Sequence, residues 1–524
     1  MQRTCVQPTG LPQASALAAA ASYEPDRVAR FFEHPYRDLG SFKAAASELN
    51  YPDDRRASMM RALRACNPPS PALERLAKPG VLTVVTGQQV GLFSGPSYTI
   101  YKALHAAKLA AWLSDNGVPA VPVFWLATED HDFAEVNHAW VFNSEHRPGR
   151  VVARRVASGQ PVGSVTLAEP PITELREKME GLPFLHEALA LIEASYRPGV
   201  PMGAAFGSLL REILAAFDIL QVDPLGPEFR EAAAPALASA VRTAPELTAA
   251  VLNRGKELVE AGFHAQVHVE EETSFVFLLE GGKRIALRRH GDEYVAGARR
   301  LSRAELMERA VSLSPNALLR PVIQDSVFPT VAYVGGPGEI AYLAQAQVIY
   351  QSLLGRMPVA VPRASFTLLD AHSEKLLDRY RLQLGDFFEG EQGLRQKIAS
   401  SLTPPSLNNA LNQASSEVDS ALATLRDAFS GFDVTLVSAL DRSAGKMHYQ
   451  MGKLERKAGR EAMARDRRAE HDASSLYGLI CPERHLQERL YSFIPFLAKH
   501  GLDLPSKVYE AIQLDCPDHQ ILVV

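Results

Sequence analysis

Two short runs of apolar, β-branched residues with a helical segment between them constrain the fold of this chain more than any other feature. The runs are Val81–Val85 and Val121–Leu126, and neither alternates with polar residues. Unbroken apolar runs of this length are typical of strands covered on both faces, as in a parallel sheet. The residues between them, 98–114, carry apolar side chains at helical spacing and end at Asn116-Gly117. Because such crossovers are right-handed, this unit predicts one half of a doubly wound, Rossmann-like α/β sheet.

Two later runs of the same kind, at 219–222 and 330–334, extend the expected sheet. Between them, residues 274–280 and 283–289 flank Gly281-Gly282, a pattern that predicts a β-hairpin. We therefore expect a core with connecting insertions, followed by a helical arm. The expected divisions are a Rossmann-like core of residues 1–142, 201–230 and 320–366, insertions at 143–200 and 231–319, a helical coiled-coil region at 367–475, and a segment at 476–524 that packs back on the core.

The helical region contains a regular apolar repeat with alternate spacings of four and three. Its members are Leu407, Leu411, Ala414, Val418, Ala421 and Leu425, followed after a turn at 430–433 by Val437, Leu440, Ala444, Met447, Met451, Leu454 and Ala458. Two heptad stretches around a turn predict an antiparallel coiled-coil hairpin. A seam this regular seldom faces water, so we expect it to mediate self-association or domain packing. The basic side chains between 446 and 468 are typical of a solvated flank, and contact with phosphate or RNA is the alternative.

Composition narrows the class of protein. The chain has 524 residues, 46% hydrophobic and 22% charged, which is typical of a globular protein of two or three domains. A net charge of −5 gives no overall attraction to nucleic acid or acidic membranes. No apolar run approaches the roughly 20 residues of a membrane-spanning helix, and we find no signal-peptide pattern. The cysteines at 5, 66, 481 and 516 are scattered, so we expect a cytoplasmic protein whose thiols carry no chemistry.

The first polar motif, Thr86–Pro96, is a strand-to-helix turn with three glycines. Unshielded backbone amides at a helix start bind anions, and two glutamines add amide donors. The Ser-Gly-Pro sequence predicts a helix start capped by a hydroxyl, and Lys102, about 12 Å further up the helix, can lean back toward it. The expected binding residues are Thr86, Gly87, Gln88, Gln89, Ser94, Gly95, Pro96 and Lys102. The spacing fits neither a dinucleotide nor a P-loop fingerprint, so a purely geometric turn is the alternative.

The second motif is a row of four ionisable side chains after the second strand, Glu129, Asp130, His131 and Asp132. They cannot all be buried without partners, and carboxylates crowded beside a histidine shift pKa values as proton-transfer sites do. We expect a substrate-binding or acid/base role, with His131 as the acid/base candidate. Alternatively, Asp132 and Glu135 form a helix capping box. His131, Glu135 and His138 would share a helical face, but without a fourth ligand we predict no metal site.

The third motif again ends a strand in glycines and opens a helix. Its candidate binding residues are Tyr333, Gly335, Gly336, Gly338 and Glu339. Three polar loops at the carboxyl edge of one sheet predict a shared ligand crevice. Arg320 and Asp325 lie just upstream and are candidates to join it.

Together these motifs resemble the bacillithiol-biosynthesis cysteine-adding enzymes, a cysteine ligase family. The matching segments are 86–89, 91–92, 94–96, 122–125, 129–133, 137–138, 333–339 and 486–489, in the family's order. The resemblance implies a Rossmann-like core with insertions, a coiled-coil arm and a homodimer. It also implies a reaction that adds L-cysteine to glucosaminyl-malate in the last step of bacillithiol biosynthesis.

An amide made from a free carboxylate needs an activated acyl group, so we expect ATP or another nucleotide as co-substrate and no covalently bound cofactor. The glycine turn and Lys102 would then hold phosphates, while the acidic row binds the cysteine ammonium or accepts a proton. The expected partners are these small molecules, without membrane or nucleic acid. Two alternatives stay open: a non-catalytic nucleotide-binding coiled-coil module, and an aminoacyl-tRNA-synthetase-like enzyme that binds RNA. Adenylate exchange with cysteine and salt-dependent RNA binding distinguish them.

Overall fold

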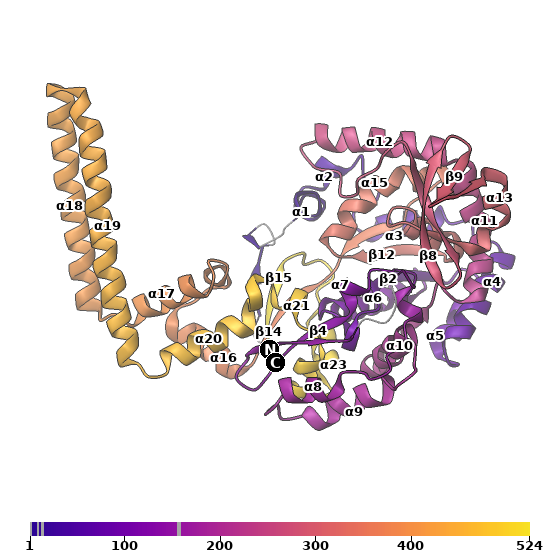
Figure 1. Ribbon diagram of the computed structural model, residues 1–524, viewed down its shortest axis with the longest axis horizontal. Helices are drawn as coiled ribbons and strands as arrows, with labels where there is room; N and C mark the ends of the chain where they lie inside the picture. The colour runs from indigo at the N-terminus through magenta and orange to yellow at the C-terminus, as the bar shows by residue number, and fades with distance from the viewer. Residues whose placement is uncertain (1–2, 8–9, 12–14, 155–158) are drawn as a thin grey trace.

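The computed structural model describes residues 3–7, 10–11, 15–154 and 159–524, and its core is a five-stranded parallel sheet in the order β13-β12-β2-β3-β6 (Figure 1). The strands are β2 (Leu82–Gln89), β3 (Ala120–Ala127), β6 (Leu220–Val222), β12 (Thr330–Gly335) and β13 (Val359–Pro362). The sequence predicts the first four but not β13. Since the chain runs outward on both sides of β2, the sheet is doubly wound and the Rossmann-like prediction is confirmed.

Helix α6 (Tyr98–Asp115) makes the predicted crossover from β2 to β3. Its Leu113 belongs to a buried cluster with Val84 on one face of the sheet. The next strand residue, Val85, points to the opposite face and lies in a cluster with Phe229. Both faces are therefore covered, which explains why the strands read as unbroken apolar runs. The other helices of the core are α1 (Ala16–Tyr23), α2 (Pro25–Val28), α3 (Leu39–Ser47), α4 (Asp53–Cys66), α5 (Pro71–Leu76), α14 (Arg320–Val327) and α15 (Pro337–Leu354).

Between β6 and β12 the chain builds a second sheet, antiparallel and in the order β10-β9-β8-β7-β11. The predicted hairpin is confirmed as β7 and β8, whose turn uses Gly281 and Gly282 with φ of 58° and 72°. Positive φ at both central residues is the conformation that two-residue hairpin turns require. The elements of this region are α11 (Pro227–Arg242), α12 (Ala244–Glu260), β7 (Thr273–Glu280), β8 (Lys283–His290), β9 (Glu293–Ala296), β10 (Arg299–Ser302), α13 (Arg303–Glu308) and β11 (Leu313–Pro315).

The region between β3 and β6 forms a short antiparallel pair, β4 and β5, and four α-helices in its described residues. Its elements are α7 (Phe133–Val136), β4 (His138–Phe142), β5 (Pro148–Val152), α8 (Ile172–Lys178), α9 (Leu185–Ser195) and α10 (Met202–Ile213). A third sheet, in the order β1-β15-β14, joins the two ends of the chain. Its strands are β1 (Arg3–Val6), β14 (Ser365–Leu369) and β15 (His519–Val523).

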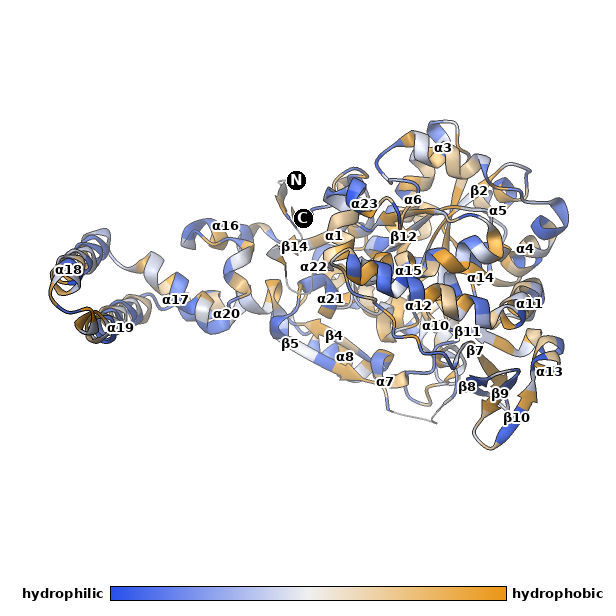
Figure 2. Cartoon of the chain, turned by 90° about the horizontal axis from the view of Figure 1, so that it is seen from above, coloured by the Kyte–Doolittle hydropathy of each residue, from blue (hydrophilic) through white to orange (hydrophobic). Residues whose placement is uncertain are grey.

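The predicted coiled-coil hairpin is confirmed as α18 (Pro405–Phe432) and α19 (Val434–Arg465), which lie side by side and project away from the core (Figures 1 and 2). The seam differs in detail from the heptad prediction. Leu422 is buried, whereas Leu425 is 44% exposed. A straight helix drifts by about 20° per heptad, so the contact line moves off the strict repeat.

The remaining helices connect the arm to the core. They are α16 (Ala371–Tyr380), α17 (Glu391–Leu402), α20 (Ala469–Ile480), α21 (Gln487–Leu490), α22 (Ile494–His500) and α23 (Leu504–Ala511). The C-terminal segment contacts the core closely, with the Phe493 ring packed edge-on against Tyr101 of α6 at 6.1 Å. In the described part of the chain, no helix combines the length and apolar character needed to span a membrane.

Candidate active site

A cleft of about 620 Å³ opens at the carboxyl ends of β2, β3 and β12. All three sequence motifs contribute to it, together with residues from β7, β8 and the C-terminal segment. The motif residues that line it are Gly87, Gln88, Gln89, Lys102, Glu129, Asp130, Tyr333, Gly336, Gly338 and Glu339. Ligands of doubly wound sheets bind at this edge, so the cleft is the candidate active site.

Lys102 joins the first motif to the third. Its side chain leans back along α6, as expected, and Nζ donates to the Gly87 carbonyl at 2.5 Å and to Oε1 of Gln88 at 3.1 Å. Nζ also lies 2.6 Å from Oε2 of Glu339. Burial raises the pKa of Glu339, but the ammonium outweighs it and holds that pKa below its usual range. The two side chains therefore form an ion pair, with a buried lysine and a partly buried glutamate, that fixes the relative positions of β2 and α15.

Glu339 is the centre of a hydrogen-bond network in the third motif. It accepts from the Tyr333 hydroxyl and from the backbone N–H of Gly336, both at 2.7 Å. Arg320 donates to the Tyr333 hydroxyl at 3.1 Å and so joins the site, as its position in the sequence suggested. Asp325 does not, because it is buried in hydrogen bonds with neighbouring side chains and does not line the cleft.

Asp130 and Glu135 meet the first motif across the cleft. The Gln89 side-chain amide donates to Oδ2 of Asp130 at 2.6 Å and to Oε2 of Glu135 at 2.9 Å. Arg284 of β8 lies 3.9 Å from Oδ1 of Asp130. Burial raises the pKa of Asp130, but Gln89, the next two backbone N–H groups and Arg284 together hold it below its usual range. Asp130 therefore offers the cleft a fixed negative charge.

Glu129 has a different environment from its neighbour. It is 8% exposed, and its nearest cation, Arg230, lies 3.7 Å away between NH1 and Oε1. Burial raises the pKa of Glu129 to about 7, against the opposing charges of Arg284 and Arg230. A carboxyl group with a pKa near neutrality can take up and release a proton at physiological pH.

His131 lies on the rim of the cleft rather than inside it. Its side chain is 40% exposed, and Nδ1 lies 3.3 Å from NH1 of Arg284. The ring packs against Phe277 with 5.7 Å between centroids. Of the two proton-transfer candidates Glu129 and His131, Glu129 is therefore the one inside the cleft.

Asp132 acts as the cap of the short helix α7, accepting from the backbone N–H of Glu135 at 3.3 Å. The reciprocal bond of a capping box is not formed, because the Glu135 carboxylate points into the cleft instead. Helix α7 ends before His138, which begins β4. The expectation that His131, Glu135 and His138 share a helical face is therefore wrong.

Ser94, Gly95 and Pro96 lie away from the cleft, which corrects the expected helix start. Helix α6 begins at Tyr98 and has no side-chain cap. Ser94 is buried with a φ of 77°, and its Oγ accepts from the backbone N–H of Phe493 at 3.3 Å. The three residues dock α6 onto the C-terminal segment, a contact between positions about four hundred residues apart that local capping rules do not reveal.

Thr86 and Gly335 belong to the sheet beneath the cleft. The Thr86 hydroxyl donates to the Val334 carbonyl at 2.8 Å, and Gly335 ends β12 without lining the cleft. Gly87 lines the floor, where a Cβ would lie 2.7 Å from Cβ of Trp125. The glycine at this position therefore permits the close approach of β2 and β3.

Several cleft residues escaped the sequence analysis. They include Tyr98, Gln266, Arg284, Asn316 and Arg363. Arg363 lies over the Tyr98 ring at 5.0 Å and forms a buried double ion pair with Glu488, at 2.6 and 2.9 Å. Single arginines in separate segments carry no spacing signal, and only the 486–489 segment was noted, through the family resemblance.

Comparison with known protein families gives a direct match over nearly the whole chain. Residues 1–364 match "Bacillithiol biosynthesis BshC, N-terminal Rossmann-like domain", and residues 366–524 match "Bacillithiol biosynthesis BshC, C-terminal coiled-coil domain". The chain belongs to the BshC family. The family resemblance inferred from the sequence motifs is confirmed, and so is the combination of a Rossmann-like domain with a coiled-coil domain.

Curated BshC proteins are similar along most of their length. A protein from Solibacter usitatus is 60% identical over 100% of both chains. One from Koribacter versatilis is 38% identical over 86% of this chain and 85% of its own, and one from Chlorobaculum tepidum is 30% identical over 84% and 82%. Each of the three is named "Putative cysteine ligase BshC". The similarity therefore extends beyond the Rossmann-like core to the arm.

Proposed function

We propose that this BshC-family chain is a ligase that forms an amide between the carboxyl group of L-cysteine and the amine of glucosaminyl-malate, the last step of bacillithiol biosynthesis. The names of its relatives support the ligase class and cysteine as a substrate. The bond type, the acceptor and the co-substrate are parts of our proposal.

The observation that carries the proposal is the presence of opposite charges in one cleft. The basic side chains are Lys102, Arg284, Arg320, Arg363 and Arg489, and the acidic ones are Glu129, Asp130, Glu135 and Glu339. Asp130 and Glu135 suit the ammonium of a free amino acid, while arginine forks suit the carboxylates of a malate group. A cleft of about 620 Å³ is in the size range of small-molecule sites.

The proposal includes ATP or another nucleotide, because a free carboxylate does not react with an amine unaided. In the activating step an oxygen of the cysteine carboxylate bonds to a phosphorus atom of the nucleotide as a P–O bond of the phosphate chain breaks. Attack on the α-phosphorus releases pyrophosphate and leaves an acyl adenylate, whereas attack on the γ-phosphorus releases the nucleoside diphosphate and leaves an acyl phosphate. The acceptor amine then attacks the acyl carbon, forming the amide and releasing the phosphate-bearing oxygen together with one proton. Lys102 and Arg320 are the cations that would stabilise the developing negative charge.

Glu129 is our candidate for taking that proton. Its pKa of about 7 lets it be deprotonated before the amine attacks and protonated afterwards, and it lies inside the cleft beside Asp130. His131, the acid/base candidate from the sequence, is assigned an orienting role through its contact with Arg284.

The direct test is a reaction with cysteine, glucosaminyl-malate and each common nucleoside triphosphate, followed by mass spectrometry. We expect a product of the two substrates joined with loss of water, and cysteine-dependent exchange of pyrophosphate into ATP if activation proceeds through an adenylate. No product with any nucleotide would contradict the ligase assignment. Pyrophosphate exchange without product would mean that only the proposed acceptor, glucosaminyl-malate, is wrong.

Asp130→Asn tests where the amino acid binds. We expect the cysteine concentration needed for half-maximal rate to rise at least about tenfold, since losing a desolvated ion pair costs on the order of 1–3 kcal/mol, with a smaller change for the nucleotide. N-acetylcysteine, which lacks the ammonium, should be a poor substrate of the wild type. Asp132→Asn is the control, because Asp132 caps α7 and asparagine caps equally well. Equal losses for both ligands would assign the acidic row to the phosphate side.

A further inference from the structure

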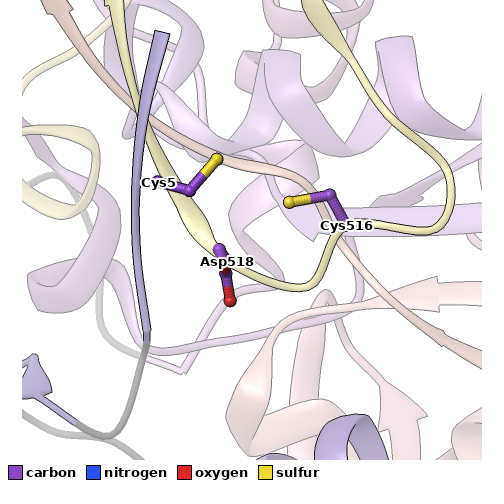
Figure 3. A group of neighbouring side chains, drawn as sticks. All are labelled: Cys5, Cys516 and Asp518. Carbon is purple, nitrogen blue, oxygen red and sulfur yellow. The ribbon is translucent and has the colours of Figure 1, made fainter.

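Two cysteines that the sequence places at opposite ends of the chain lie together with a carboxylate. Cys5 belongs to β1, and Cys516 and Asp518 precede β15 (Figure 3). Their two sulfur atoms and one carboxylate oxygen all lie within 4.8 Å of one another. Among the described residues, no other set of three cysteine, histidine or acidic side chains meets this condition. The expectation that the thiols are scattered and without chemistry is therefore open to revision.

Strand pairing produces this proximity. β1 and β15 are antiparallel, with Val6 opposite His519 and Cys5 opposite Gln520. Residues directly opposite share a face of the sheet, and the diagonal neighbour two positions along, Asp518, lies on that face as well. Gln520 is completely buried, and neither its side-chain oxygen nor its nitrogen has a hydrogen-bond partner in the structure. It supplies an unsatisfied polar group beside the cluster.

The cluster lacks a positive charge. In the described chain, Asp518 pairs with no lysine or arginine, and its carboxylate accepts from the Tyr23 hydroxyl. A divalent cation would supply that charge, because it replaces the thiol protons and neutralises the carboxylate at the same time.

We propose that Cys5, Cys516 and Asp518 bind a Zn²⁺ ion, with water as the fourth ligand. Ligand atoms around tetrahedral Zn²⁺ lie about 3.3–3.8 Å apart, given bonds of about 2.0–2.3 Å, and small side-chain adjustments reach that spacing. Binding releases the two thiol protons to solvent, and no oxidant or reductant takes part. Cys5 is exposed, so the ion has a route of entry and a place for the water ligand. The ion would fasten β1 to the segment before β15, far along the chain from the motifs of the cleft.

The test uses the full-length protein, reduced and freed of metal, and titrates it with Co²⁺ alone and then with Zn²⁺. We expect one Co²⁺ per chain with the near-ultraviolet absorption of cobalt–thiolate bonds and the intense visible bands of tetrahedral Co²⁺, and displacement by Zn²⁺. Cys5→Ser and Cys516→Ser should abolish the thiolate absorption. Asp518→Asn should weaken binding by at least about tenfold, the lower end of the loss caused by removing even an outer-shell partner. Cys66→Ser, a change to a half-buried cysteine outside the cluster, should bind like wild type.

A second measurement does not depend on spectroscopy. Zn²⁺ should raise the unfolding temperature of wild type and Cys66→Ser but not of the Cys5→Ser/Cys516→Ser double variant. Substoichiometric Co²⁺ binding, or binding that survives the double substitution, overturns the proposal. Isolation of the protein with a Cys5–Cys516 disulfide that persists under mild reduction, detected by counting free thiols, also overturns it and assigns the pair a redox role.

Discussion

Lys102 and Glu339 neutralise each other's charge at the floor of the cleft. Lys102→Ala would leave a partly buried carboxylate without its cation, and breaking one side of an ion pair costs up to about 3–5 kcal/mol when the pair is fully buried. The single variant should therefore lose both stability and activity. Lys102→Met combined with Glu339→Gln removes both charges and should recover most of the stability while turnover stays at least about a hundredfold below wild type, the size of effect seen when one preorganised charge-stabilising group is lost.

The measurements are thermal unfolding and the rate of product formation for the three proteins. Normal turnover in the double variant would show that the pair is structural only. An unfolded double variant would show that Gly87 and Gln88, which Lys102 also contacts, need the ammonium for the fold itself.

Glu129 gives the activity a predicted pH dependence. If it accepts the proton, it must be ionised, so kcat/KM should rise with pH through about 7 and level off above. In Glu129→Gln this limb should disappear and the rate should fall by about 10²–10⁴-fold, the usual contribution of a general base. A pH profile of Glu129→Gln that keeps the same limb would assign the titration to another group.

The raised pKa of Glu129 also makes stability depend on pH, and stability should fall with rising pH where activity rises. The pKa of Glu129 is raised from 4.5 to about 7, so the folded chain binds more protons than the unfolded chain between these values. Its contribution is therefore complete below about pH 4.5 and is lost as the pH rises through about 7, by on the order of 3 kcal/mol. Glu129→Gln should be more stable than wild type at pH 8 and no more stable at pH 4.5, as denaturant unfolding at the two pH values can determine.

Among the elements, the turn at Val162–Ser164 holds the acidic row in place. The backbone N–H of Gly163 donates to the Thr128 carbonyl at 2.9 Å, and that of Val162 donates to the Asp130 carbonyl at 2.6 Å. A Cβ at Gly163 would collide with the Thr128 side chain. Gly163→Ala should therefore push the turn away, destabilise the protein by about 1–3 kcal/mol and weaken cysteine binding.

Gly385→Ala is the matched control for this change, since a Cβ at Gly385 meets nothing within 4 Å and its φ is not positive. Unfolding temperature and the cysteine requirement are the two readouts. A Gly163→Ala protein that matches the control in both would mean that the turn accommodates a methyl group without moving the acidic row.

The elements themselves could be predicted well from the sequence, because buried parallel strands, a glycine hairpin and a heptad repeat each depend on nearby residues. Interactions between distant segments could not. Ser94 looked like a helix cap, but its hydroxyl oxygen accepts a hydrogen bond from the backbone N–H of Phe493 instead. Arg284 and Arg363 reach the cleft from β8 and from the end of β13, where single arginines look like ordinary surface residues. The arm seam was predicted as a strict heptad, and helix drift exposes Leu425 instead.

At the scale of the whole molecule, the arm is the part most suited to self-association. Its two helices cover only a narrow stripe of each other and leave apolar side chains in solvent. The exposed ones in the predicted seam are Leu407, Leu425, Met447 and Leu454, at 42%, 44%, 47% and 54%. Deleting residues 405–460 should therefore reduce the mass in light scattering from that of a dimer to that of a monomer.

A triple substitution tests the same self-association without removing the arm. Leu425→Glu with Met447→Glu and Leu454→Glu places charges on these exposed sites without touching Leu422 or Leu440, which are buried between the helices. Asn412→Glu, on the other side of α18 from Leu425, is the control and should leave the dimer intact. A dimer that survives both the deletion and the triple substitution would locate self-association elsewhere.

The sheet formed by β1, β15 and β14 can be completed only after β15 has been translated. β1 emerges from the ribosome well before β14, yet both need β15 between them, and β15 is translated after either of them. Domains generally fold as they are made, starting from the N-terminal side, so the Rossmann-like sheet can assemble while β1 still has no partner. An unpaired strand is a template for wrong pairing, and β1 carries Cys5 throughout that interval. β15 therefore completes a sheet to which β1 contributes a strand made much earlier, and nascent chains stalled just short of β15 would be the form most prone to aggregate.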